Sequence, residues 1–337
     1  MIAPASIKSI LLSRTDSIGD VMLTLPLAGI LKSNIPGVQI IFLGKAYTKA
    51  VIECCNHVDR FVDWDEVSRL EEGGQKKYFR ELNADMIIHV FPNRKISRLA
   101  KISGIPHRIG TSHRIFHWLT CNHLPGFSRS NSDLHEAQLS VKLLAPLGMD
   151  KTYSLDALTS FSGFANRYAL PDKWRDILDG NRKKIILHPK SQGSAREWSP
   201  DNFSRLIELL PQEKFQLFIS GTAGEKNSLL EFLERNKDKV TDLTGQLSLG
   251  EFIAFIDACD GLVAASTGPL HIASMLGKKA IGIYPPMRPI HPGRWSPIGK
   301  NSVALAVDRK CDDCRKSGSC HCMNEIAPAS IRDLLLD

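Results

Sequence analysis

The chain has 337 residues, which is too long for one ordinary hydrophobic core and predicts two domains of about 150 residues each. A composition of 43% hydrophobic and 23% charged residues indicates a soluble globular protein, and no apolar run approaches the roughly 20 residues that a membrane-spanning helix needs. The formal net charge of +7 favours anionic ligands, but the basic residues lack the interleaved aromatics of a nucleic-acid surface, so we expect no nucleic-acid partner.

The expected strands are short runs of β-branched and aromatic residues, separated by segments with helical periodicity. Strands are expected at residues 7–13, 38–44, 60–64, 84–91, 183–190, 215–221, 239–245, 261–267, 279–285 and 302–308. Helices of the second half are expected at residues 201–210, 225–236, 248–259 and 269–277. Continuous apolar runs, rather than strict alternation, indicate strands that are buried on both faces, and therefore parallel sheets covered by helices.

These elements predict an α/β fold with two doubly wound, Rossmann-like domains. We expect the domains at residues 1–160 and 184–337, with the weakly patterned residues 161–183 as the linker. Ligands of such sheets bind at the carboxyl ends of the strands. We therefore expect the two sheets to face each other across a cleft that holds the substrates.

The first strand-to-helix turn lies in RTDSIGDVMLTLPL, residues 14–27. Strand, glycine turn and helix resemble a phosphate site, yet Asp20 places a negative charge where a phosphate would bind. A dinucleotide site would need G-x-G-x-x-G after a strand, and neither this pattern nor a P-loop occurs in the sequence. The negative charge therefore argues against a cofactor pyrophosphate at this turn, and a cap of the following helix is a common role for an aspartate there.

A second strand-to-helix turn lies in ASTGPLHIASMLG, residues 265–277. Hydroxyls of Ser266 and Thr267, the turn at Gly268 and the positive helix end converge there, with Pro269 at the first helical position and His271 as an added donor. This arrangement predicts an anion site. The alternative is N-capping by one of the two hydroxyls, with His271 packed under the loop.

The two turns together resemble glycosyltransferase family 9, the heptosyltransferases that extend the lipopolysaccharide inner core with a GT-B fold. Supporting motifs follow in the same order: ILHPKSQGSAREWSPDNF at 186–203, LFISGTAGEK at 217–226 and CHCMNEIAPASI at 320–331. The resemblance implies an inverting transferase that moves a heptose from a nucleotide-diphosphate heptose, with adenine as the implied base, to a lipopolysaccharide core or related lipid-linked acceptor. It implies no metal and no cofactor beyond this donor substrate.

The resemblance also assigns the site residues. Asp20 is implied as the general base, and Arg196 stands where the family often has a lysine that faces the diphosphate. Ser191 and Glu225 are implied in donor binding, Glu225 toward a ribose hydroxyl, together with the turn from Ser266 to His271. The alternative for Arg196 is a solvated surface arginine. The alternative for Glu225 is a glutamate that only stabilises the first turn of its helix through the helix dipole. Several family members have an aspartate at position 266, so the donor sugar can differ.

The acceptor side is expected in the first half of the chain. No Asp or Glu occurs from Met86 to Ser132, a stretch with many Arg and Lys residues. The expected acceptor-binding residues are Arg14, Gly19, Arg94, Arg98 and Arg114. They would face a phosphorylated or acidic lipid-linked glycan through a peripheral, electrostatic contact with the membrane surface. The N-terminal apolar segment is too short for a signal peptide, so the cytoplasm is the expected location.

Four of the eight cysteines form the cluster C-x2-C-x5-C-x-C at Cys311, Cys314, Cys320 and Cys322. Four thiolates can bind zinc tetrahedrally, but the usual pair of C-x2-C knuckles is missing. Disulfides are unusual in the cytoplasm. We therefore expect free structural thiols, with structural zinc and disulfides as alternatives.

Two other functions are compatible with this architecture. A noncatalytic protein that binds a sugar nucleotide or a glycan on a GT-B scaffold would tolerate a change of Asp20, whereas a transferase would not. A GT-B epimerase would need acidic groups placed to direct water to the anomeric carbon, and no such set can be identified in the sequence.

Overall fold

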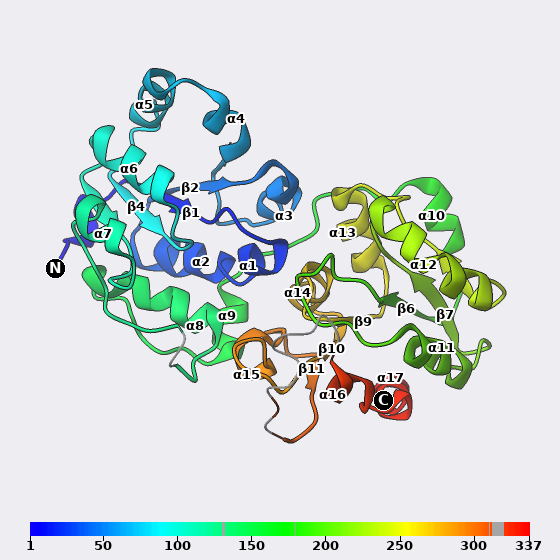
Figure 1. The fold of residues 1–337 in the computed structure, drawn as a ribbon. Helices are drawn as coiled ribbons and strands as arrows, with labels where there is room; N and C mark the ends of the chain where they lie inside the picture. Colours follow the sequence, from blue (N-terminus) through cyan, green and yellow to red (C-terminus); the bar gives the residue numbers. More distant parts are fainter. Residues whose placement is uncertain (130–131, 179, 310, 312–319) are drawn as a thin grey trace. The chain divides into compact units, whose positions relative to one another are not determined.

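The computed structural model describes residues 1–129, 132–178, 180–309, 311 and 320–337. The chain divides into two compact units, Met1–Ala165 and Asn166–Asp337, called here the N-terminal unit and the C-terminal unit (Figure 1). The division falls inside the stretch 161–183 that was expected to link the domains.

The N-terminal unit is built on one parallel five-stranded sheet of order β3-β2-β1-β4-β5. Its strands are β1 (Ser9–Ser13), β2 (Gln39–Gly44), β3 (Arg60–Asp63), β4 (Met86–His89) and β5 (His107–Ile109). Its helices are α1 (Ile18–Met22), α2 (Leu25–Asn34), α3 (Lys49–Glu53), α4 (Trp64–Arg69), α5 (Glu72–Glu81), α6 (Arg94–Ile102), α7 (Ile115–Thr120), α8 (Glu136–Val141) and α9 (Leu155–Ser160). Short 3-10 turns are η1 (Pro4–Ser6), η2 (Ala46–Thr48) and η3 (Lys142–Leu147).

The C-terminal unit is built on a parallel six-stranded sheet of order β11-β10-β9-β6-β7-β8. Its strands are β6 (Lys183–His188), β7 (Phe215–Ile219), β8 (Val240–Asp242), β9 (Gly261–Ala265), β10 (Lys279–Ile283) and β11 (Ser302–Leu305). Its helices are α10 (Asp172–Ile177), α11 (Pro200–Leu209), α12 (Ala223–Asn236), α13 (Leu249–Ala258), α14 (Gly268–Met275), α15 (Pro292–Trp295), α16 (His321–Asn324) and α17 (Pro328–Leu336).

The core explains why the strands are continuous apolar runs. Every residue of β1 and of β9 is buried, because helices cover both faces of the sheets. In the N-terminal unit Leu11, Ile41 and Ile87 pack in one cluster with residues of α4, α5 and α6. In the C-terminal unit Trp198 and Phe203 pack with residues of β6, β7 and the C-terminal helix α17.

Both sheets change strand order at the same relative place. The chain builds one side of each sheet first, then crosses to the other side, so that β1 lies beside β4 and β6 lies beside β9. Such a switch point leaves a crevice at the carboxyl ends of the two neighbouring strands, and ligands of open α/β sheets bind there. The residues that follow β1, β4, β6 and β9 are therefore the first place to look for a site.

The α/β prediction is confirmed, and every expected strand is present, each one to four residues shorter than expected. The sequence analysis missed β5, a three-residue strand with only Ile109 buried, because so short and mixed a run has no clear period. Helix α14 begins at Gly268, so Pro269 occupies the second helical position and not the expected first. Among the described residues, no helix has the length and hydrophobicity required to span a membrane.

Candidate active site

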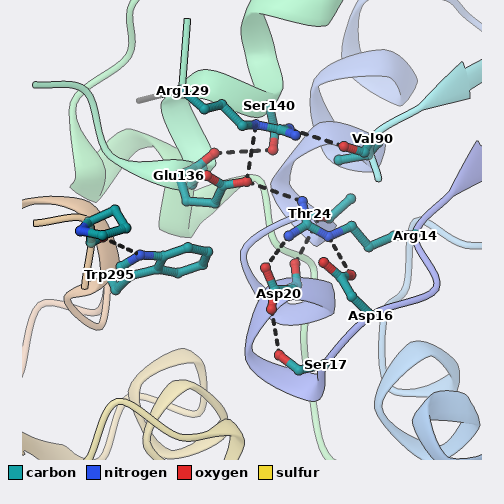
Figure 2. Close-up of polar contacts among 12 residues, drawn as sticks. Arg14, Asp16, Ser17, Asp20, Thr24, Val90, Arg129, Glu136, Ser140 and Trp295 are labelled. Carbon is teal, nitrogen blue, oxygen red and sulfur yellow. Dashed lines mark hydrogen bonds and ion pairs between the residues drawn. The ribbon is translucent and has the colours of Figure 1, made fainter. Parts of the chain in front are cut away.

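A buried arginine organises the carboxyl ends of the N-terminal sheet (Figure 2). Arg14 directly follows β1, and only 3% of its side chain is exposed. Its Nε lies 2.7 Å from Asp16 Oδ1, one Nη atom donates to Asp20, and the other lies 3.3 Å from Glu136 Oε1. One guanidinium therefore holds three carboxylates, two from the turn after β1 and one from the distant helix α8.

Asp20 lies in the first turn of α1, after the N-cap residue Ser17. Its two carboxylate oxygens accept hydrogen bonds from Arg14 and from the Ser17 hydroxyl, and 19% of its side chain is exposed. The Thr24 hydroxyl donates to the Asp20 backbone carbonyl over 2.9 Å. Since Ser17 occupies the N-cap position, the capping alternative does not describe Asp20. The side chain is instead fixed by two donors and partly open to solvent.

The Asp16 carboxyl of this network has a perturbed pKa. Burial raises the pKa of the Asp16 carboxyl to about 6; the Arg14 guanidinium opposes this rise, and the neighbouring Asp20 charge adds to it. Burial also disfavours the charge on Arg14, yet its three carboxylate partners raise the pKa of its guanidinium above the ordinary value. Arg14 is therefore permanently charged, while Asp16 can exchange a proton near neutral pH.

Glu136 connects this network to the end of β4. It is the first residue of α8, is 2% exposed, and its Oε1 also lies 3.4 Å from Arg129 Nε. Arg129 in turn donates from Nη2 to the backbone carbonyl of Val90, which directly follows β4, over 3.0 Å. The network thus spans the switch point between β1 and β4 (Figure 2).

The expected acceptor-binding residues fall into two groups. Arg14 and Gly19 are buried beside Asp20, Arg14 in the ion-pair network and Gly19 in α1. Arg94 and Arg98 are exposed on α6, and Arg114 is exposed at the N-cap of α7. The structure therefore brings Arg14 and Gly19 to the Asp20 turn, whereas the other three lie exposed on α6 and at the start of α7.

In the C-terminal unit, the loop after β6 is shaped by its own side chains. His188 ends β6, its Nδ1 lies 2.9 Å from the Ser220 hydroxyl, and burial lowers its pKa to about 4, so it is neutral at pH 7. Ser191 is buried, and both its amide and its hydroxyl donate to Glu197 Oε1 over 2.9 Å. The hydrogen bonds of Ser191 thus hold the loop, and its role in donor binding stays a prediction.

Glu225 lies in the first turn of α12 and closes a capping box with Thr222. One carboxylate oxygen accepts from the Thr222 backbone N–H over 2.8 Å, and the other accepts from the Gln192 backbone N–H over 3.1 Å. These contacts join the start of α12 to the loop after β6. They agree with the alternative in which Glu225 stabilises the first turn of α12. Its role toward a ribose stays a prediction.

Arg196 lines a cavity of about 400 Å³ within the C-terminal unit. The cavity lies between two loops and is lined by Gly193, Ser194, Ala195, Arg196, Met287, Arg288, Pro289 and Ile290. Two guanidinium-bearing residues, Arg196 and Arg288, therefore belong to its wall. Arg196 is half-buried, and it is not the fully solvated surface arginine of the alternative interpretation. Arg288 was not among the expected donor-binding residues, because no motif surrounds this exposed loop arginine.

The turn after β9 presents a polar group that the fold itself does not use. Thr267 is the N-cap residue of α14 and is 5% exposed, yet its hydroxyl makes no capping bond and has no hydrogen-bond partner among the described residues. The first amides of a helix also lack partners within the helix. Ser266 forms a hydrogen bond with the buried Tyr284 hydroxyl, and His271 is buried in α14. The capping alternative therefore does not hold for Thr267.

The cysteine cluster is only partly described. Cys314 lies outside the described residues, so the four-thiol site cannot be evaluated as a whole. Burial disfavours the thiolate of Cys322, but hydrogen bonds from Arg309, Cys311 and Cys320 outweigh it and lower its pKa. The described cysteines are free thiols, and within the described ranges no three His, Cys, Asp or Glu side chains are grouped so as to hold a metal ion.

Residues 75–323 match the model of glycosyltransferase family 9 (heptosyltransferase). The chain belongs to this family. A Haemophilus influenzae protein provisionally named a glycosyltransferase is 27% identical over 331 residues, which cover 94% of this chain and 92% of that protein. Lipopolysaccharide heptosyltransferase 2 of Escherichia coli K12 is 22% identical over 297 residues, 81% of each chain. The chain is therefore a glycosyltransferase of the heptosyltransferase family.

Solved structures support the fold assignment. The structure of Escherichia coli heptosyltransferase WaaC with ADP aligns with a TM-score of 0.71 at 17% identity, over 97% of this chain and 99% of that chain. The two parallel sheets with their covering helices are thus the GT-B type of α/β fold that the sequence predicted.

Proposed function

We propose that this protein transfers a heptose, with inversion, from ADP-heptose to a lipopolysaccharide core or related lipid-linked acceptor. Family membership supports the heptosyltransferase activity, the relative from Escherichia coli supports the lipopolysaccharide acceptor, and the neighbouring structure with bound ADP supports the nucleotide. The observation that carries the mechanism is the Asp20 carboxylate, oriented by Arg14 and Ser17 at the end of β1 and still 19% exposed.

In the proposed reaction an acceptor hydroxyl attacks the anomeric carbon while Asp20 takes its proton. A general base must lie within hydrogen-bond reach of the proton and must be held in one orientation. Two donors from its own turn give Asp20 that orientation. The bond from the anomeric carbon to the diphosphate breaks as the new glycosidic bond forms, so the configuration inverts and ADP leaves with the electron pair.

The leaving diphosphate needs positive partners, and the C-terminal unit supplies candidates for them. The amides at the start of α14 and the Thr267 hydroxyl suit phosphate oxygens. Arg196 and Arg288 line the cavity beside the loop after β6 and can neutralise charge as it develops. The reaction proposed here needs no cofactor, because Asp20 takes the proton and these groups balance the leaving charge.

We also propose that the enzyme works in the cytoplasm, in peripheral contact with the membrane that holds its acceptor. Arg94, Arg98 and Arg114 are exposed, and the stretch from Met86 to Ser132 has no acidic residue. Exposed cations of this kind are attracted to anionic lipids and to phosphorylated glycolipids.

The test combines binding and turnover. ADP, UDP and GDP are titrated calorimetrically into the wild type, Asp20→Asn and the control Asp156→Asn, an exposed carboxylate on α9. Turnover of ADP-heptose is then assayed on a core-lipid acceptor. We expect all three proteins to prefer ADP, and turnover to fall by about 10²-fold or more in Asp20→Asn alone. Unchanged turnover in Asp20→Asn would remove Asp20 from the mechanism, and binding without turnover in the wild type would favour a protein that only binds sugar nucleotides.

A further inference from the structure

Three large hydrophobic side chains of α7 point into solvent. Ile115 is 86% exposed, Trp118 is 64% exposed and Leu119 is 70% exposed. Apart from Met1, they are the most exposed large hydrophobic side chains in the part of the chain that the structure describes. Their spacing of three and four residues places them on one face of the helix, and together they form what we call the α7 patch.

A buried histidine and hydrogen bonds fix α7 to the domain. His117 is fully buried, and its Nδ1 lies 3.0 Å from the Thr111 carbonyl. The Trp118 indole N–H donates to the Ser112 carbonyl over 2.8 Å, and Lys101 Nζ donates to the Leu119 carbonyl over 2.8 Å. The patch is therefore presented by an anchored helix. Because the indole N–H already has a partner, the ring can enter an apolar phase without losing a hydrogen bond.

Positive charge borders the α7 patch. Helix α6 packs beside α7 (Figure 1) and exposes Arg94, Arg98 and Lys101 at a spacing of four and three residues, which we call the α6 stripe. Arg98 also forms a surface pair with Glu72 of α5 at 3.0 Å. Arg114 is exposed immediately before Ile115.

We propose that the α7 patch and the α6 stripe dock onto the surface of an anionic lipid bilayer, with the three apolar side chains inserted at the boundary between headgroups and acyl chains. This inference rests on the proposed function, since a transferase that acts on a lipid-linked acceptor must reach the membrane. It adds an apolar anchor to the electrostatic contact that the sequence predicted.

The chemistry of the surface favours a bilayer over a protein partner. A stable protein–protein interface buries about 800 Å² on each partner, whereas this patch consists of three side chains on a six-residue helix. Tryptophan with aliphatic neighbours and a border of Arg and Lys is the composition of a segment that lies in the membrane interface. The complementary partner of the cations is an anionic headgroup.

The test uses the full chain and vesicles without any glycolipid acceptor. Flotation measures binding to phosphatidylcholine vesicles and to vesicles with about 30% phosphatidylglycerol. The wild type is compared with the triple variant Ile115→Ser, Trp118→Ser, Leu119→Ser, and with Leu230→Ser, an exposed leucine of α12 that is 54% exposed. We expect the wild type and Leu230→Ser to bind anionic vesicles more tightly than neutral ones, and the triple variant to lose about tenfold or more.

A second readout reports insertion itself. Lipids brominated near the headgroup should quench tryptophan fluorescence in the wild type more than in Trp118→Phe. ADP binding and turnover on a water-soluble, deacylated acceptor should be equal in the wild type and the triple variant, which shows that the variant is folded. Wild-type protein that ignores anionic vesicles, or a triple variant that binds them equally well, would overturn the inference. A protein complex or dimer that disappears in the triple variant would assign the patch to a protein partner and also overturn it.

The two proposals fail in different ways. If the wild type binds vesicles but transfers no heptose to any acceptor, the proposed function fails and the membrane surface stands. If it transfers heptose to the soluble acceptor but does not bind vesicles, the membrane-docking inference is refuted and the proposed function stands.

Discussion

Replacing Asp16 by asparagine should reveal an energetic cost that the ionised Asp16 carboxylate imposes on the folded state. The pKa of Asp16 rises from an ordinary 3.8 to about 6 on folding, mainly because burial disfavours its charge. Between these two values the folded protein binds more protons than the unfolded chain, so stability falls as the pH rises through this window. At about 1.4 kcal/mol per pKa unit, the full interval corresponds to about 3 kcal/mol, and because 21% of the Asp16 side chain is exposed this is an upper estimate.

The measurable part of this effect lies in the neutral range. A group with a folded pKa of about 6 and an unfolded pKa of 3.8 loses about 1.4 kcal/mol of stability between pH 5 and pH 8. Asparagine mimics the protonated carboxyl and can still accept from Arg14 Nε, which lies 2.7 Å from Asp16 Oδ1. The variant should therefore gain up to about 1.4 kcal/mol over the wild type as the pH rises from 5 to 8.

Urea unfolding at pH 5, 6, 7 and 8 measures this difference, provided that the slope with denaturant is the same for both proteins. Taking the difference between variant and wild type removes the titration of all other groups. Asp156→Asn, an exposed carboxylate of the same unit, serves as the control and should show no pH-dependent difference. If the difference between Asp16→Asn and the wild type is constant from pH 5 to 8, the raised pKa is refuted. An unshifted or lowered pKa would titrate below pH 5 and would therefore give such a constant difference.

Three further predictions concern buried polar groups. Thr267→Val should leave the free energy of unfolding unchanged or raise it by about 1 kcal/mol, because the hydroxyl has no partner among the described residues. If the hydroxyl contacts the diphosphate, the same variant should bind ADP about tenfold more weakly in calorimetry. Glu136→Gln should cost about 3 kcal/mol in urea unfolding, since it removes a 2% exposed carboxylate that faces Arg14 and Arg129; a cost below about 0.5 kcal/mol would show that the network does not depend on it. Burial lowers the pKa of His89 to about 3. The free energy of unfolding of the wild type should therefore fall by up to about 1.4 kcal/mol per pH unit as the pH falls below 6.5. His89→Leu should show a weaker dependence of thermal stability on pH in this acidic range.

The fold was predictable because its information is local. Strands buried on both faces must be continuous apolar runs, and SILLS and GLVAA are such runs. The same reasoning does not detect β5, because His107 and Arg108 are half-buried and this edge strand pairs with β4 alone. Capping boxes were equally local: Glu225 lies three residues after Thr222, and both interpretations of Glu225 could be written from that spacing.

The candidate site was predictable only where it is contained in one turn. Asp20 follows from the strand, turn and helix around it, and so does its neighbour Arg14. Glu136 lies 122 residues away from Arg14, and nothing in a single sequence indicates that this glutamate reaches the end of β1. The raised pKa of Asp16 results mainly from its burial in the folded domain, and a single sequence does not show that burial.

The α7 patch shows the opposite failure, in which a local pattern is misleading. An apolar run such as IFHWLT predicts a buried segment, yet Ile115 and Leu119 are exposed and the polar His117 faces the core. His117 can be buried because its Nδ1 has the Thr111 carbonyl as a partner and its ring stacks on His89. The orientation of the helix thus buries His117 and leaves Ile115, Trp118 and Leu119 exposed.

The two switch points carry opposite electrostatics on the same topology, and this contrast is the strongest physical support for a transferase. At β1 and β4 three carboxylates surround Arg14, and a phosphate would meet Asp20 there. At β6 and β9 the corresponding turns offer a helix N-terminus, an unused hydroxyl on Thr267 and the arginine-lined cavity, with Glu225 held in its capping box. The proposed proton acceptor in one unit and the proposed anion site in the other are the two groups that displacement of a diphosphate by a sugar hydroxyl requires. A protein that only binds nucleotides has no need of the first, so the energetic cost of burying the Asp16 charge beside Asp20 argues for chemistry at that turn.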